Sequence, residues 1–451
     1  MATPGRTWRR SGSSTRLLPS RVTERRRLAG ALPAARTSVR GLWVWIHRWV
    51  GLLMALVLVI EGLTGSLVAF RAPLSRWLAP GLHAHEPHPG ARPLPLGTLA
   101  QRAQEVIGSR ARIAYFFDGA DAGRTMVRVA PAIDSAIGRP FSIDYGWVAF
   151  DPWTGRELGR YTEGGYTSGV LANVMPFVYN LHTTLTLGGL GYWILGITAL
   201  AWTLDCVYAF YLTFPRGRHR FLRRWREAWQ VKGNAGAFRI NFDLHRAGGL
   251  WFWALLLVFA WSSVQLTLYQ VYEPVMSAVS DYETADQEIG DLPQRTSGSP
   301  PRLDWIAAQA VGDALIAERA RIEGFRALRP TMMAYFIPNG IYSYSVATDR
   351  SWPDFSEYNV WFDGDTGKLF KIPRAHGEHA GNTVTNWLRA LHLATDPMDR
   401  SWYRWLICLT GLYTVILCLT GVYVWWKKRT ARRRSRRHAA TPAATATDGT
   451  A

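Results

Sequence analysis

Four long apolar segments constrain the fold of this chain more than any other feature of its sequence. They cover residues 43–70, 177–214, 248–272 and 405–426, and the last two contain no charged residue. A run of about 20 apolar residues is long enough to cross the hydrocarbon core of a bilayer as a helix. The sequence therefore predicts an α-helical membrane protein with four transmembrane helices, the first an uncleaved helix rather than a signal peptide.

Basic residues gather at three places, and this distribution predicts an orientation. Arginine and lysine are dense before residue 42, between residues 215 and 246, and after residue 426. Cytoplasmic segments beside transmembrane helices carry an excess of these residues. We therefore expect a multi-pass membrane protein with both termini in the cytoplasm and the two long connections facing outward. The net charge of +19 then reflects topology and contact with anionic lipid, and no nucleic-acid partner is expected.

The three cysteines exclude two kinds of chemistry. Cys206, Cys408 and Cys418 all fall inside apolar segments, so no disulfide is expected in the outward connections. The chain has no Cys-x-x-Cys-His sequence, and this excludes covalent attachment of a c-type haem.

A long internal repeat predicts the fold class: four transmembrane helices in a tandem duplication, with two outward-facing small α+β domains. His47 and His245 begin similar apolar runs, and AFDPWTGRELGRY (149–161) resembles WFDGDTGKLFKIP (361–373). The expected order is a disordered basic cytoplasmic tail (1–40), the first span (41–71), the first α+β domain (72–172), an outer histidine segment with the second span (173–214), a cytoplasmic basic loop (215–244), the third span (245–273), the second α+β domain (274–380), an outer histidine segment with the fourth span (381–427), and a second disordered basic tail (428–451).

Hydrophobic patterning predicts the elements of the two outward domains. Each is expected to contain one helix followed by strands, with Asp, Gly and Thr at the turns. The first domain has a helix at 96–107 and strands at 112–117, 125–130 and 147–150; the second has a helix at 303–317 and strands at 332–337, 342–348 and 358–362. Neither contains a nucleophile motif, a glycine-rich phosphate loop or a zinc pattern.

Four histidines at the ends of the apolar segments form two matched pairs. His47 and His245 begin the pattern His-Arg-x-x-Gly-Leu, whereas His182 and His392 each follow a leucine ahead of another apolar run. The predicted topology places the first pair near the cytoplasmic face and the second near the outer face. Imidazole is a strong iron ligand, and helix bundles hold cofactors between facing helices. The pattern indicates one haem at each pair, with a non-haem metal site or a structural interfacial role as alternatives.

Several neighbours of these histidines have two interpretations. Arg48 and Arg246 either neutralise haem propionates or serve as ordinary cytoplasmic anchors. Glu61 and Asp205 are acids within spans and are therefore candidates for a proton path, a quinol site or a polar helix contact. Nearby glycines either admit a macrocycle or pack helices together: Gly51, Gly188, Gly189, Gly191, Gly248 and Gly249.

Other histidines offer weaker candidates. His83, His85 and His88 lie in a Pro-rich linker and either bind a metal ion or belong to a solvated segment, which is the favoured interpretation. His376 and His379 precede His392 and offer a replacement ligand, but their spacing has no counterpart in the first half.

The segments HRWVGLLMALVLVIEGLTGSLVAF, FDLHRAGGLWFWALLL and NLHTTLTLGGLGYWILG, with the two Thr-Gly turns, resemble PepSY-associated transmembrane proteins over about residues 41–428. The resemblance implies that the outward domains are PepSY-like. It also implies that the chain holds two b-type haems through four axial histidines: His47, His182, His245 and His392. The chain departs from the family pattern on the outer side, with AWSSVQLTLY at 260–269 and TDPMDR after the last histidine.

The family includes bacterial inner-membrane proteins tied to iron uptake and a ferric-siderophore reductase with bound b-type haem. The resemblance therefore implies a dihaem reductase that passes electrons outward to a ferric siderophore or another Fe(III) chelate. The donor would be quinol or an unidentified protein, because the sequence shows no NAD(P)H or flavin domain. The alternative is a non-enzymatic PepSY regulator, or an assembly partner of a peptidase or iron transporter. A permease is disfavoured because paired broken helices are not expected.

Overall fold

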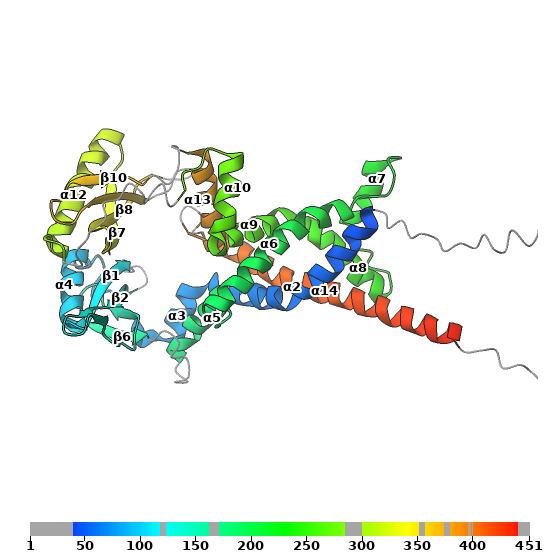
Figure 1. Cartoon of the computed structure of the whole chain (residues 1–451), viewed down its shortest axis with the longest axis horizontal. Helices are drawn as coiled ribbons and strands as arrows, with labels where there is room; N and C mark the ends of the chain where they lie inside the picture. The colour runs from blue at the N-terminus through cyan, green and yellow to red at the C-terminus, as the bar shows by residue number, and fades with distance from the viewer. Residues whose placement is uncertain are drawn as a thin grey trace, which may run out of the picture.

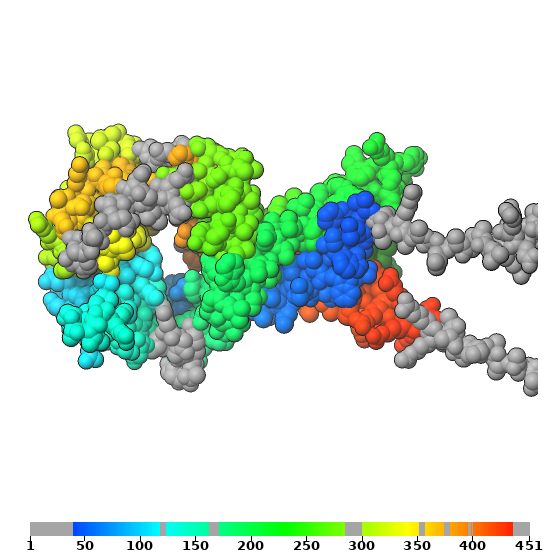
Figure 2. All heavy atoms as spheres, in the orientation of Figure 1, coloured from blue at the N-terminus to red at the C-terminus, as the bar shows by residue number. Residues whose placement is uncertain are grey.

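The fold is given by a computed structural model that describes residues 39–117, 123–161, 171–284, 300–350, 357–373, 379–395, 398 and 400–440. A β-sheet with two helices occupies one end of an elongated molecule, and long helices extend from it (Figure 1). The start of α2 (Val39–Val68) and the end of α14 (Ser401–Ala440) lie at the opposite end, as the space-filling view also shows (Figure 2).

Three helices of the described chain are long and apolar enough to cross a membrane: α2, α6 (Gly189–Leu212) and the part of α14 from Ser401 to Ser435. Most of their side chains are not buried within the protein. Leu53 and Leu56 on α2, for example, are 83% and 71% exposed. Large apolar side chains on such helices need lipid to cover them. The protein is therefore a membrane protein.

The prediction of four transmembrane helices is wrong, because the expected third span is broken. It is divided into α8 (Ala237–Trp251) and α9 (Trp253–Thr267), which meet at a bend of 69° and reach the length of a span only if taken together. At the bend, the Phe252 ring stacks on Tyr413 of α14 with centres 4.5 Å apart, and the Tyr413 hydroxyl donates to the carbonyl of Leu244. The hydropathy of the predicted third span shows that it is apolar, but hydropathy does not show whether a helix is bent.

Small residues allow α2 and α14 to cross closely. A Cβ atom on Gly62 would lie 2.5 Å from the carbonyl oxygen of Gly411, so neither helix has room for a side chain there. The Ser66 hydroxyl adds an interhelical hydrogen bond of 3.0 Å to the carbonyl of Cys408. Close backbone approach and polar contacts of this kind hold helices together in lipid.

Shorter helices connect the spans to the sheet and to each other. Four of them lie at the end of the spans that faces the sheet: α3 (Arg71–Leu78), α5 (Val174–Thr184), α10 (Tyr269–Val279) and α13 (Ala380–Leu393) (Figure 1). At the far end α7 (Phe221–Arg226) precedes α8. Short 3₁₀ turns occur at Pro80–Leu82, Leu171–Asn173 and Glu227–Trp229.

The strands form one antiparallel sheet of eight strands rather than two separate domains. Its order is β10-β9-β8-β7-β1-β2-β5-β6. The strands are β1 (Ala111–Phe117), β2 (Thr125–Pro131), β5 (Trp147–Phe150), β6 (Glu157–Tyr161), β7 (Ala327–Phe336), β8 (Ile341–Thr348), β9 (Glu357–Asp363) and β10 (Leu369–Lys371); a small hairpin joins β3 (Ile133–Asp134) to β4 (Arg139–Pro140).

The junction between the two sets of strands corrects the prediction of two independent α+β domains. Strand β1 pairs with β7 through Tyr115 and Ala334, Phe116 and Met333, and Phe117 and Met332. The helices α4 (Leu96–Ile107) and α12 (Trp305–Glu323) contribute to one apolar core, which includes buried side chains from both sets of strands. Each unit alone would leave an unpaired strand edge, and this pairing removes both edges.

The turns that follow β5 and β9 have the same geometry. Asp151 accepts hydrogen bonds from the backbone N–H groups of Trp153 and Thr154, and Asp363 accepts them from Asp365 and Thr366. Each turn closes on a glycine with a φ of 72°, where a side chain would be strained. Burial opposes the charge on Asp363, but its hydrogen bonds with Thr366 and Asp365 hold the pKa of this carboxyl below its ordinary value.

Candidate functional site

The structure brings the inner pair of histidines together. His47 lies on α2 and His245 on α8, and their ring centres are 6.0 Å apart with the planes tilted by 48°. Two imidazoles that bind one metal ion from opposite sides have centres about 6 Å apart, because each nitrogen lies about 2 Å from the metal. The separation of the inner pair therefore fits two ligands of one metal.

The Nδ1 atoms of the inner pair are both engaged by neighbouring helices. Nδ1 of His47 lies 2.8 Å from a carboxylate oxygen of Asp205 on α6. Nδ1 of His245 lies 3.0 Å from the carbonyl oxygen of Leu417 and 3.3 Å from the hydroxyl of Thr420, both on α14. The carboxylate and the carbonyl can only accept, so each histidine donates from Nδ1.

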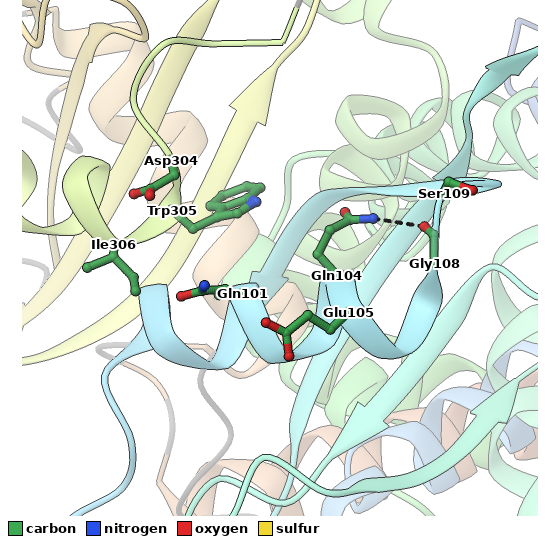
Figure 3. A pocket seen from close by; sticks show the side chains of 8 residues that line it. All are labelled: Gln101, Gln104, Glu105, Gly108, Ser109, Asp304, Trp305 and Ile306. Carbon is green, nitrogen blue, oxygen red and sulfur yellow. Dashed lines mark hydrogen bonds between the residues drawn. The ribbon is translucent and has the colours of Figure 1, made fainter.

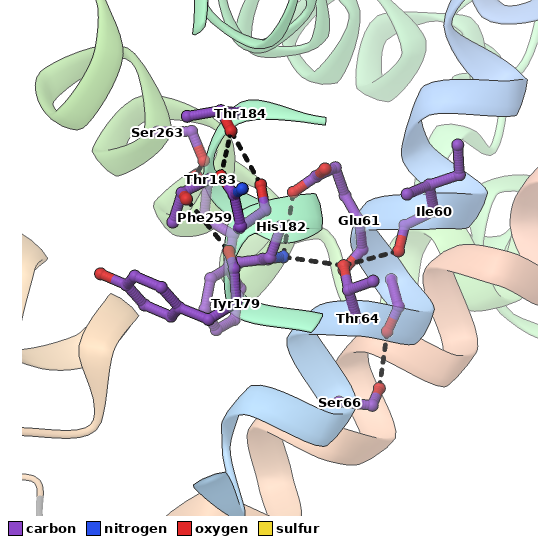
Figure 4. A network of polar contacts seen from close by, with 12 residues as sticks. Ile60, Glu61, Thr64, Ser66, Tyr179, His182, Thr183, Thr184, Phe259 and Ser263 are labelled. Atoms are coloured by element: carbon purple, nitrogen blue, oxygen red, sulfur yellow. Dashed lines mark hydrogen bonds and ion pairs between the residues drawn. The ribbon is translucent and has the colours of Figure 1, made fainter. Parts of the chain in front are cut away.

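The outer pair follows the same rule with different partners. His182 lies on α5, and its Nδ1 is 3.0 Å from both Glu61 and Thr64 of α2 (Figure 4). The Thr64 hydroxyl already donates to the carbonyl of Ile60 at 2.7 Å, so it accepts from His182. His392 lies on α13, and its Nδ1 is 2.7 Å from the Ser262 hydroxyl of α9. Ser262 in turn donates to the carbonyl of Val258, so His392 is again the donor.

All four rings therefore carry their proton on Nδ1 and a lone pair on Nε2. Within the described residues, no hydrogen bond occupies Nε2 of any of the four. Histidines that bind metal ions typically donate their other ring N–H to a carboxylate, a carbonyl or another acceptor, which fixes the tautomer. The arrangement can supply four nitrogen ligands in two pairs.

Two glycines that the sequence did not single out pack against these rings. A Cβ atom on Gly65 would lie 3.0 Å from Cε1 of His182, and one on Gly421 would lie 3.0 Å from Cε1 of His245. Gly248, which was predicted as a candidate, instead packs against the Tyr413 hydroxyl and serves a helix contact. A Cβ atom added to the candidates Gly51, Gly188 or Gly189 would meet no other group within 4 Å. Gly191 packs against the backbone of Thr184, the last residue of the preceding helix.

The two arginines beside the inner histidines have different surroundings. Arg246 is held by the fully buried carboxylate of Asp243 at 2.9 Å and donates to the carbonyl of Glu227, so it has a structural role. Asp243 also pairs with Arg239 at 2.8 Å. Arg48 forms no such ion pair with a carboxylate in the part of the chain that the structure describes.

The other candidate histidines do not form a metal site in the described chain, where no group of three or more potential ligands occurs. His85 and His88 are exposed, as a solvated segment predicts, but His83 is buried, and for that residue the prediction is wrong. His379 lies 3.1 Å from Asp281 in an ion pair. His376 lies outside the described residues.

A shallow groove between α4 and the start of α12 is lined by eight residues, among them Gln104, Glu105, Asp304 and Trp305 (Figure 3). The Gln104 side-chain amide donates hydrogen bonds to the backbone carbonyls of Gly108 and Ala111. The groove lies at the end of the molecule that holds the sheet, away from the two histidine pairs.

The sequence offered Glu61 and Asp205 as candidates for a proton path, a quinol site or a polar helix contact, without linking them to the histidines. In the structure each contacts the Nδ1 atom of a histidine. Thr64, Ser262 and Thr420 were missed entirely. A hydroxyl on an apolar helix is common, and only the fold shows which one faces an imidazole ring.

One family model matches the chain, that of the PepSY-associated TM region, over residues 44–428. No curated protein matches the chain. The match covers far more than half of the 451 residues and confirms the resemblance seen in the sequence. The chain therefore belongs to the PepSY-associated TM region family.

Proposed function

We propose that this protein binds two b-type haems and passes electrons across the membrane to a ferric siderophore or another Fe(III) chelate. The observation that carries the proposal is the protonation pattern of the four histidines. Each donates from Nδ1 and presents an Nε2 lone pair, and the inner pair has the separation that one shared metal requires. A structural interfacial histidine has no need for this pattern at four positions.

The two pairs lie at different depths along α2. His47 belongs to the inner pair, and Thr64, which contacts His182 of the outer pair, lies 17 residues further along the same helix (64 minus 47). At 1.5 Å per residue these positions are about 26 Å apart, close to the thickness of the hydrocarbon core. Such spacing supports a path from one face of the membrane to the other.

A haem held by two histidines carries one electron at a time and has no open position for substrate. In this proposal His47 and His245 would hold one haem, and His182 and His392 would hold the other. The acceptor would be reduced at the outer surface without binding to the haem iron. Reduction would release the metal, because hard oxygen ligands hold Fe(II) less firmly than Fe(III). A quinol or another electron donor would supply the electrons.

The distribution of basic residues supports a location in the inner membrane with both termini in the cytoplasm. The start of α2, the basic helix α7 and the basic end of α14 lie at one end of the molecule, and the sheet lies at the other (Figure 1). Arg48 and Lys428 are available near the inner pair to face an anionic group such as a propionate.

The test is an optical titration of the purified protein. The dithionite-reduced protein is expected to show the spectrum of low-spin bis-histidine haem and to reoxidise when a ferric siderophore is added. His47→Ala is expected to remove about half of the haem, and His392→Ala the other half. Substitution of His379, a half-buried histidine paired with Asp281, is the control and should leave the haem content unchanged. A protein without haem after expression in haem-replete cells would favour the non-enzymatic regulator instead.

A further inference from the structure

The acids of the membrane helices show an asymmetry between the two halves of the chain. Asp205 and Glu61 each contact Nδ1 of a first-half histidine, His47 and His182 respectively. The second-half histidines have neutral partners: His245 faces the Leu417 carbonyl and Thr420, and His392 faces Ser262. Each proposed haem site therefore combines one ligand with an anionic partner and one ligand with a neutral partner.

The two carboxylates are largely buried. Their side chains are only 12% and 20% exposed, and within the described residues the only basic side chain within 4 Å of each carboxylate is a histidine. The second oxygen of Glu61 is buried without a hydrogen bond to any described residue. An acid within an apolar helix is costly, so a positive charge close by is needed to explain its position.

We propose that Asp205 and Glu61 are positioning residues that set the reduction potential of the two sites through His47 and His182. This inference rests on the proposed function. A carboxylate that accepts the Nδ1 proton orients the ring and increases the basicity of Nε2. It also places a negative charge near the iron, where it stabilises the more positive ferric state. Both effects lower the reduction potential, so each carboxylate favours delivery of the electron onward.

The neutral partners of the second half provide the comparison within the same protein. Ser262 and the Leu417 carbonyl orient His392 and His245 by hydrogen bonds of 2.7 and 3.0 Å, which are about as short as the contacts of the two carboxylates. Neither partner carries a charge. Loss of the Ser262 hydroxyl would therefore remove the hydrogen bond that orients His392 without removing a negative charge from the site. The two kinds of partner therefore separate the effect of charge from the effect of positioning.

The experiment is a redox titration of Asp205→Asn and Glu61→Gln, followed optically. Asparagine and glutamine retain an oxygen that accepts from Nδ1 and remove only the charge. Each variant is expected to keep both haems and to raise one of the two potentials, by at least tenfold in the reduction equilibrium, or about 59 mV for one electron. The other potential should stay at its wild-type value. Thr420→Val, which leaves the Leu417 carbonyl on His245, is the matched control and should shift neither potential by this amount.

The outcomes separate this inference from the function on which it rests. Wild-type protein without haem would reject the proposed function. Full haem content with both potentials unchanged in the two variants would overturn the inference alone. If Asp205→Asn loses its haem, Asp205→Glu should restore haem and the low potential together, because it restores the charge. Restored haem with a raised potential, or no restoration, would show a structural role and would also overturn the inference.

Discussion

At the scale of single residues, buried charge pairs are the features that the sequence hides best. Asp243 is fully buried and binds Arg239 and Arg246 at 2.8 and 2.9 Å. Sequence reasoning assigned Arg246 to either a propionate or the membrane surface, because arginine beside a histidine suits both. Its carboxylate partner lies only three residues away, but periodicity alone does not show that this partner is buried.

Loss of the Asp243 carboxylate should destabilise the end of the protein where α8 begins. Asp243→Asn is expected to cost about 3 kcal/mol, because removing one member of a buried ion pair leaves the arginines without their partner. Thermal unfolding in detergent measures the effect. Asp281→Asn is the control, since its exposed pair with His379 should contribute less than about 1 kcal/mol. Equal stability of the two variants would contradict the role assigned to Asp243.

The turn at Asp363 should make stability depend on pH. Its folded-state pKa is depressed by hydrogen bonds with Thr366 and Asp365 despite partial burial, so the carboxylate form stabilises the fold. The contribution is complete above the unfolded pKa of about 4 and disappears as the pH falls through the lower, folded value. Asp363→Asn should therefore be less stable than wild type at pH 7, and the difference should vanish in acid. A difference that does not change with pH would exclude this explanation.

At the scale of elements, local patterning predicted the regular parts of the sheet domain well. The predicted helix at 96–107 is α4, and the strands expected at 112–117, 147–150 and 342–348 are found as β1, β5 and β8 within one residue at each end. Alternating burial and turn residues determine these elements locally. Phe252 lies at the bend and contacts Tyr413, which is 161 residues further along the chain (413 minus 252). No local pattern could reveal this contact.

The crossing of α2 and α14 should tolerate no side chain at its centre. Gly62→Ala would place a Cβ atom 2.5 Å from the Gly411 carbonyl oxygen, and the helices would have to separate. We expect a loss of about 1–3 kcal/mol, as in other overpacked contacts. Gly51→Ala on the same helix is the control, because a Cβ there meets nothing within 4 Å. Unfolding that is indistinguishable between the two variants would argue against this crossing.

At the scale of the whole molecule, three of the four predicted membrane segments are found as spans in the described chain, but the sequence did not show how the parts join. Two α+β units were expected, and one eight-stranded sheet is found. Strand pairing between β1 and β7 links residues more than 200 positions apart, such as Phe116 and Met333. The predicted topology already grouped His47 with His245. The groups that contact the Nδ1 atoms of the histidines could be identified only from the three-dimensional structure.

If the sheet domain is one cooperative unit, damage on one side should reach the other. Phe116 is fully buried in the shared core, and Phe116→Ala is expected to cost about 3–5 kcal/mol. Hydrogen exchange should then speed up in β8 and β9 as well as in β1 and β2. Protection that falls only in β1, β2, β5 and β6 would instead indicate two independent units.

The haem content of the purified wild-type protein tests the central claim most directly. The measurement is the ratio of haem to protein, by pyridine haemochrome assay against amino-acid analysis, after expression with adequate haem. Two paired sets of Nε2 lone pairs predict a ratio near two. A ratio near one would reject one of the pairs as a site, and a ratio near zero would contradict the account of all four histidines.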